Sequence, residues 1–197
     1  MAVTQRTRKP AVGKAGAETK AGRQDWIMAA LTLLGRAGID AVRVEPLAEK
    51  LGVTKGSFYW HFKDRDALHA AMLEAWQAGT TQNVIDRVEK ESATRDGRLN
   101  QLIVIALEHS WAARLETGVR AWAKHDARAA RAITEVDARR LDYVVSLLLD
   151  LGIDARTARL RARIIYLMLI GVYFAGDVGS ERSQKALWAE VERLLRS

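Results

Sequence analysis

Residues 52–68 read GVTKGSFYWHFKDRDAL, with four consecutive ring-bearing side chains lying between two lysines. Neighbouring residues of a helix point about 100° apart, so these four rings cannot all face one core. Phe58 groups with Phe62 on the inward face. The three ring side chains that follow Phe58 must then face at least partly outward: Tyr59, Trp60 and His61. The alternative is that the next helix of the same chain covers them, Trp60 more readily than Tyr59.

Short helical patterns surround this stretch. Residues 25–37 form an amphipathic helix that Gly38 is placed to end, and VEPLAEKL at 44–51 forms a second helix. A third helix starts after Thr54, a residue suited to the N-cap, and Asp64 caps a longer fourth helix. Two short helices joined by a tight Leu-Gly-Val turn are the layout of a helix-turn-helix, whose second helix enters the major groove of DNA.

Composition excludes several other classes of protein. The 197 residues are 49% hydrophobic and 28% charged with 2 prolines, and strong helix formers dominate, so we expect an all-α fold. Cysteine is absent and the four histidines lack zinc-binding spacing, so no metal site and no cofactor are expected. The apolar run from Ile164 to Gly176 is too short to cross a bilayer. With no signal-peptide pattern either, a cytoplasmic protein without a membrane partner is expected.

Positive charge is concentrated at the N-terminus. The chain has a net charge of +7, and residues 1–23 hold six basic side chains against one acidic side chain. Such an arm is disordered when free because it has too little apolar surface to bury. It is either a solvated tail or, beside a DNA-reading module, a contact for phosphates or the minor groove.

Residues 26–76 resemble the DNA-binding domain of the TetR family of bacterial transcriptional regulators. The resemblance rests on the amphipathic first helix with its Ala-Gly end, on LAEKLGV at 47–53, on TKGSFYWHF at 54–62 and on DRDAL at 64–68. It implies an N-terminal helix-turn-helix domain followed by a C-terminal helical domain for effector binding and dimerisation. The implied boundaries are a basic arm at 1–22, a reading domain at 23–69 with its fourth helix continuing to about 90 as a connector, and a second domain at 91–197.

The resemblance also implies roles for individual residues. Thr54, Tyr59 and His61 would bind phosphates, and Lys63 and Arg65 would bind the backbone beside the same groove. The residues nearest the base edges would be Lys55, Gly56, Ser57 and Trp60, with Lys55 able to reach a guanine O6/N7 edge.

The second helix departs from the family pattern at its start. Arg43 stands where the family usually has a Ser or Thr cap; it cannot accept the capping hydrogen bond, but it can reach a phosphate. Glu45 follows in a turn that often faces bases, where a carboxylate favours a cytosine N4 donor. Complementing the helix dipole is an equally good explanation of Glu45.

Beyond residue 80 the sequence predicts longer helices at 98–115, 118–125, 127–151, 155–176 and 181–196. The fourth of these is apolar on every side from Ile164 to Phe174, so it must be covered on every side, and a partner subunit is the expected second cover. The last helix either docks on its own domain or joins the dimer interface. The expected interface residues are Ile165, Leu169, Val172, Leu187, Trp188, Val191, Leu194 and Leu195.

The resemblance further implies a small-molecule site among the C-terminal helices. The candidate residues, each of which is alternatively an ordinary core or surface side chain, are His109, Trp111, Trp122, His125, Tyr143, Tyr166 and Tyr173. The expected function is a homodimeric repressor released from a palindromic operator by a small-molecule effector. The alternative is a DNA-binding factor of the same fold controlled by a protein partner. Catalysis is not expected, because no nucleophile elbow, phosphate-binding glycine loop or diagnostic acid–base pair is present.

Overall fold

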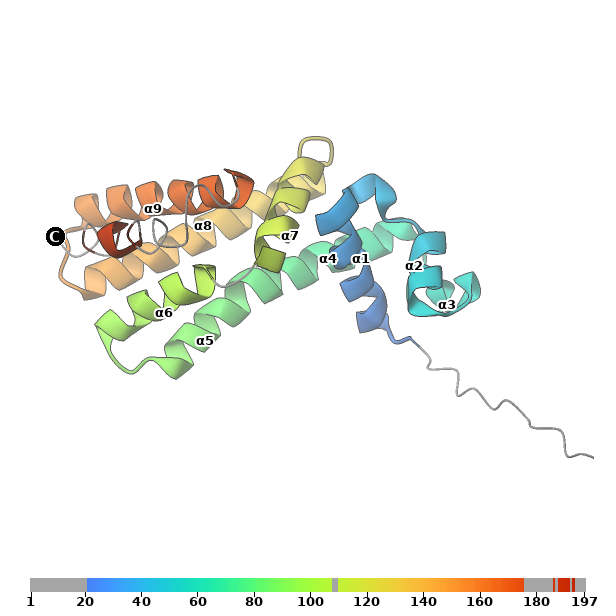
Figure 1. Ribbon diagram of the computed structural model, residues 1–197, viewed down its shortest axis with the longest axis horizontal. Helices are drawn as coiled ribbons and strands as arrows, with labels where there is room; N and C mark the ends of the chain where they lie inside the picture. Colours follow the sequence, from blue (N-terminus) through green and yellow to red (C-terminus); the bar gives the residue numbers. More distant parts are fainter. Residues whose placement is uncertain (1–20, 108–109, 176–185, 187, 192, 194–197) are drawn as a thin grey trace, which may run out of the picture.

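The computed structural model describes residues 21–107, 110–175, 186, 188–191 and 193, and over this part of the chain all regular secondary structure is helical. The fold-class prediction is therefore confirmed. The elements, shown in Figure 1, are α1 (Arg23–Ala37), η1 (Ile39–Ala41), α2 (Val44–Leu51), α3 (Lys55–Tyr59), α4 (Arg65–Gln77), η2 (Ala78–Gln82), α5 (Asn83–Glu91), α6 (Arg95–Leu107), α7 (Ser110–Trp122), α8 (Ala127–Asp150) and α9 (Ala155–Ala175).

The first four α-helices end and begin where the local chemistry requires. Gly52 adopts a left-handed φ of 67° after α2, a conformation that only glycine reaches without strain. Asp64 caps α4 by accepting a hydrogen bond from the Ala67 backbone N–H at 2.8 Å. These boundaries produce the α2–turn–α3 unit expected from the sequence.

The connector between the two halves of the molecule is helical from residue 65 to residue 91. α4 passes into the η2 segment, which is a π-helical turn, and then into α5, so the three run in line across the molecule (Figure 1). π-Helical turns are rare and occur frequently at functional sites. The last helix of this connector, α5, ends at Glu91.

Two glycines bring α1 and α7 into close contact. A β-carbon at Gly118 would lie 3.0 Å from the carbonyl oxygen of Leu34, and one at Gly35 would lie 3.3 Å from the backbone nitrogen of Leu115. The predicted helix break at Thr117-Gly118 is therefore wrong: α7 runs through it, and Gly118 serves helix packing. The predicted helix at 98–115 is wrong as well, because α6 ends at residue 107 and α7 begins at 110.

The remaining predicted helices lie near their observed places. α8 and α9 span 127–150 and 155–175, against predictions of 127–151 and 155–176. Of the predicted last helix, residues 186, 188–191 and 193 are helical, and its other positions lie outside the described residues.

The described residues form two apolar cores. The first joins α1 to α4 with α7 and the start of α8, and includes Trp26, Phe58, Met72, Trp76 and Trp122. The second joins α6, the end of α8, α9 and the last helical residues, and includes Leu99, Leu147, Leu148, Ala158, Ala162 and Val191. No helix in the described ranges combines the length and apolar character needed to span a bilayer.

Candidate nucleic-acid interface and ligand cavity

The short helix α3 divides its rings between core and surface. Phe58 and Phe62 are 0% and 3% exposed and stack with ring centroids 5.3 Å apart. Tyr59 and Trp60 are 64% and 87% exposed. This is the division that the helical spacing predicts. An indole left almost wholly in water contributes little to folding, so α3 offers an aromatic and hydrogen-bonding surface to a partner.

Lys55 and Glu45 lie together on this exposed surface. The Lys55 ammonium is 2.9 Å from the Glu45 carboxylate, which links the start of α3 to α2. The hydrogen bond from Lys55 lowers the pKa of Glu45, so the carboxylate stays ionised. Both side chains are exposed, so the pair is held weakly and can open to meet other partners.

His61 is half-buried and has an intramolecular partner. Its Nε2–H donates to the carbonyl oxygen of Ala21 at 3.0 Å, which ties the residue that follows the basic arm to the end of α3. The arm residues themselves, 1–20, lie outside the described part of the chain. His61 therefore holds Ala21, the first described residue of the chain, against the end of α3.

The other predicted DNA-contact residues surround α3. Thr54 and Arg43 occupy the N-cap positions of α3 and α2, and neither side chain makes a capping bond. Lys63, Arg65 and Gly56 are exposed, whereas Ser57 is half-buried. Basic side chains, hydroxyls and backbone N–H groups on one exposed surface are the donors that bind phosphate oxygens and base edges.

A cavity of about 160 Å³ lies in the C-terminal half. Its walls come from η2, α5, α6, α7, α8, α9 and Trp188, and they are mainly apolar, including Leu102, Ile105, Val144 and Leu169. Its polar residues gather where η2 meets α7 and α8. An apolar cavity with a few convergent polar groups is the usual form of a small-molecule site.

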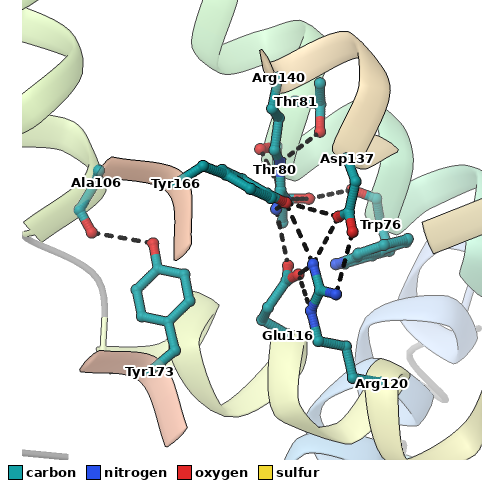
Figure 2. Close-up of polar contacts among 10 residues, drawn as sticks. All are labelled: Trp76, Thr80, Thr81, Ala106, Glu116, Arg120, Asp137, Arg140, Tyr166 and Tyr173. Atoms are coloured by element: carbon teal, nitrogen blue, oxygen red, sulfur yellow. Dashed lines mark hydrogen bonds and ion pairs between the residues drawn. The ribbon is translucent and has the colours of Figure 1, made fainter. Parts of the chain in front are cut away.

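A buried ionic network closes this polar end (Figure 2). Glu116, 1% exposed, binds the Arg120 guanidinium at 2.8 Å and the Arg140 guanidinium at 3.1 Å. Arg120 also binds Asp137 at 2.6 Å, and the Tyr166 hydroxyl donates to Asp137 at 2.6 Å. Two positive and two negative charges therefore neutralise one another, as burial of charge requires.

Arg140 connects the network to the connector helix. Its Nη2 donates to the Thr80 hydroxyl at 2.9 Å and its Nε donates to the Thr81 hydroxyl at 3.1 Å. The same guanidinium lies over the Trp76 ring, 5.8 Å from its centroid (Figure 2). The π-helical turn η2 thus contacts the cavity on one side and continues into α4 on the other.

The structure places the predicted pocket residues in three groups. Trp111, Tyr143, Tyr166 and Tyr173 line the cavity. Trp122 does not; it is 4% exposed and packs against His69 of α4 with ring centroids 5.1 Å apart, in the first core. His125 is exposed in the turn after α7, away from the cavity, and His109 lies outside the described residues.

Several predicted dimer residues instead face their own chain. Ile165, Leu169 and Trp188 line the cavity, and Val191 is 6% exposed within the second core. Val172 is half-buried, and Leu187, Leu194 and Leu195 lie outside the described residues. The reason is that α9 is apolar on both faces, so the sequence does not indicate which face is internal. The face of α9 that is exposed carries Leu160, Ile164, Leu167 and Phe174.

The ionic network was not foreseen from the sequence. Its one local signal was the i,i+4 pair Glu116–Arg120, whereas Arg120 reaches Asp137 and Arg140 reaches Glu116 across 17 and 24 positions. Such an i,i+4 pair is ordinary on a solvated helix face, and only the packing of α7 on α8 reveals that this one is buried.

Comparison with known proteins finds sequence similarity in only part of the chain, which includes the reading domain. A family model described as bacterial regulatory proteins, tetR family, matches residues 27–72. The tetracycline repressor protein class A from transposon 1721 of Escherichia coli is 37% identical over 73 residues, covering 37% of this chain and 34% of that protein. The HTH-type transcriptional regulator AcrR of Shigella flexneri is 26% identical over 91 residues, covering 46% and 42%. The chain therefore spans less than half the length of either relative in these matches.

The fold as a whole is also found in solved structures. A transcriptional regulator from Rhodococcus sp. Rha1 superposes with a TM-score of 0.64 at 17% identity, covering 89% of this chain and 92% of the other. That likeness extends the shared architecture to the C-terminal helices. Residues 27–72 of this chain therefore carry an N-terminal helix-turn-helix domain of the kind found in the tetR family of bacterial regulatory proteins.

Proposed function

We propose that this protein is a sequence-specific DNA-binding transcriptional regulator that acts as a homodimeric repressor and is released by a small-molecule effector. The observation that carries the DNA-binding role is the outward presentation of Tyr59 and Trp60 from α3, beside Lys55 and Lys63. The printed roles of the relatives, a tetracycline repressor and an HTH-type transcriptional regulator, support it. In this proposal α3 enters the major groove and the basic arm, leaving beside His61, contacts the adjoining backbone.

Dimerisation is proposed through the exposed apolar stripe of α9. Leu160, Ile164, Leu167 and Phe174 are between 56% and 66% exposed, and they follow one another at spacings of four, three and seven residues. Gly171 lies in the same row, and a β-carbon there would meet nothing within 4 Å. A contiguous apolar helix face in water marks an interaction site, and a second copy supplies a self-complementary cover.

Release is proposed to pass through the π-helical turn. An effector in the cavity touches Thr80, Thr81 and Arg140, and the same three residues join the cavity to α4. A ligand that favours one arrangement of these bonds shifts the population of α4 positions. The spacing of the two α3 helices in the dimer then no longer matches successive major grooves.

The DNA-binding role is tested by recovering genomic fragments bound to the purified protein and measuring their affinity. Because Trp60 is 87% exposed, Trp60→Ala should weaken fragment binding while leaving the melting temperature unchanged. Leu149→Ala, at an exposed position of α8 that does not line the cavity, is the control. Absence of any preference over competitor DNA for the wild-type protein would refute the proposal.

The dimer is tested by measuring the molar mass in solution. Wild-type protein should have twice the chain mass of 21.9 kDa, and Leu167→Glu should approach the chain mass because a charge would face the partner's apolar stripe. Thr134→Glu, at an exposed position of α8, is a control with the same charge change. A wild-type monomer at micromolar concentration would contradict this part.

Effector release is tested by Thr80→Val, which removes a hydroxyl that accepts from Arg140. The variant should still bind DNA but lose coupling between cavity ligands and DNA release. If no cavity ligand changes DNA affinity of the wild-type protein, control by a protein partner becomes the better explanation.

A further inference from the structure

The cavity limits the size of its occupant. The cavity is partly open, has a volume of about 160 Å³ and is lined mainly by apolar side chains such as Leu99, Ile103 and Ile165. An apolar cavity of about 150 Å³ is known to accept a benzene-sized molecule. A single ring or a short branched chain therefore fits without any repacking of the walls.

The charges at the cavity limit the charge of its occupant. Among the described lining residues, Glu116 and Arg140 are the ionised ones, and they pair with each other at 3.1 Å. Arg120 and Asp137 complete the neutral group of four. An ionised ligand would enter without an opposite charge to meet it, and burial of an unpaired charge is strongly unfavourable.

The hydrogen bonds that the cavity tyrosines already make determine whether a ligand's polar group must donate or accept. The Tyr173 hydroxyl donates to the Ala106 carbonyl oxygen at 3.0 Å (Figure 2), and the Tyr143 hydroxyl donates to Glu89 at 2.8 Å. A phenol whose proton is already donated can offer a ligand only its lone pairs. Burial raises the pKa of Tyr173 to about 12, so the phenol keeps its proton at neutral pH.

Tyr166 differs from the other two because its oxygen is already used. It donates to Asp137 and accepts from Arg120 at 3.2 Å and from Arg140 at 3.4 Å. Tyr173 lies against α6, away from this network, and its oxygen, whose proton goes to Ala106, can accept a hydrogen bond from a ligand (Figure 2).

From these three limits we propose that the cavity takes a small uncharged alcohol or phenol, about one ring in size, whose hydroxyl donates to the oxygen of Tyr173. The proposal rests on the proposed effector site and deepens it by naming the chemical class of the ligand. The apolar body of the ligand packs against the aliphatic walls, and its hydroxyl replaces hydration at the polar end.

The test compares four one-ring probes on the full-length protein: benzyl alcohol, toluene, benzylamine and benzoate. Binding is measured by isothermal titration calorimetry at neutral pH. Benzyl alcohol should bind at least about tenfold more tightly than either charged probe, with toluene between them. Equal binding of benzoate or benzylamine would overturn the argument from charge, and failure of all four probes to bind would overturn the proposal as a whole.

Tyr173→Phe tests the hydrogen bond. It should weaken benzyl alcohol about 2- to 12-fold while leaving toluene unchanged, because one neutral hydrogen bond is lost and the wall keeps its shape. Thr134→Val, which removes a hydroxyl from an exposed position of α8 outside the cavity, is the control and should change neither. If Tyr173→Phe weakened both probes equally, or neither, Tyr173 would not be the acceptor. DNA affinity of the unliganded protein, measured separately, distinguishes failure of this ligand assignment from failure of the DNA-binding proposal.

Discussion

Replacing Gly118 by alanine tests the close contact between α1 and α7, which joins the reading domain to the C-terminal half. The added β-carbon would lie 3.0 Å from the carbonyl oxygen of Leu34 and 3.3 Å from its carbonyl carbon. Both are backbone atoms of α1, so they cannot move aside as a flexible side chain would. The two helices must separate slightly, and the neighbouring core must follow.

Two opposing effects determine how much Gly118→Ala changes the free energy of unfolding. Alanine is favoured over glycine inside a helix by about 1 kcal/mol. Overpacking a close contact costs about 1–3 kcal/mol. The net change for Gly118→Ala is therefore between zero and a loss of about 2 kcal/mol. Gly79→Ala isolates the first effect, because Gly79 is also helical and a β-carbon there would meet nothing within 4 Å.

The assay is urea unfolding followed by circular dichroism, at one protein concentration for all variants because association would add to stability. The free energy of unfolding of Gly79→Ala should exceed that of Gly118→Ala by about 1–3 kcal/mol, the cost of the clash alone. In thermal unfolding each kcal/mol corresponds to about 2–4 °C for a chain of this size. If the two variants were equally stabilised, the contact between α1 and α7 would not be as close as described.

Three further predictions concern the reading domain. Lys55→Ala should reduce the preference for a recovered DNA fragment over competitor about 5- to 150-fold, measured by fluorescence anisotropy at fixed salt, whereas a uniform loss on all DNA would indicate a phosphate contact instead. Asp64→Ala removes the cap that accepts from the Ala67 N–H and should cost about 0.5–2 kcal/mol in urea unfolding; Asp64→Asn should retain most of it. Burial, with nearby arginines, lowers the pKa of His69, which packs on Trp122, so the folded state holds this side chain neutral. The stabilising contribution of neutral His69 is complete above pH about 6.5, which is the pKa of histidine in the unfolded chain. This contribution is lost as the pH falls below that value. The melting temperature should therefore fall more steeply between pH 7 and 5 in the wild type than in His69→Leu, and parallel curves would contradict this.

The reading domain was predictable because its signals are local. The boundaries of α2, the cap at Asp64 and the division of rings along α3 each depend on a few neighbouring residues. Helix geometry alone decides that Phe58 and Trp60 point in different directions.

The C-terminal half was less predictable because its decisive contacts join distant residues. Gly118 looks like a helix break in sequence, and only the crossing with α1 gives it a packing role. Trp122 looks like a ligand contact, but it fills the space beside His69, 53 positions earlier, whose ring lies 5.1 Å away. Glu116–Arg120 has the i,i+4 pattern of an ordinary surface pair, and the partner that Glu116 finds in Arg140 lies 24 positions away, so the sequence does not show that the group is buried.

α9 shows why the sequence alone does not assign the two faces of an apolar helix. Its sequence requires cover on every side, and its two faces meet different covers. On its inward face, α9 packs against α8 through small residues such as its own Ala158 and Ala162. The same face places Ile165 and Tyr173 on the cavity wall. The outward face leaves the stripe that begins at Leu160 in water. In the proposed dimer the wall that meets the ligand and the surface that meets the partner therefore belong to one helix. A ligand that shifts the inward face cannot leave the outward face unaffected, because a continuous helix moves as a nearly rigid body.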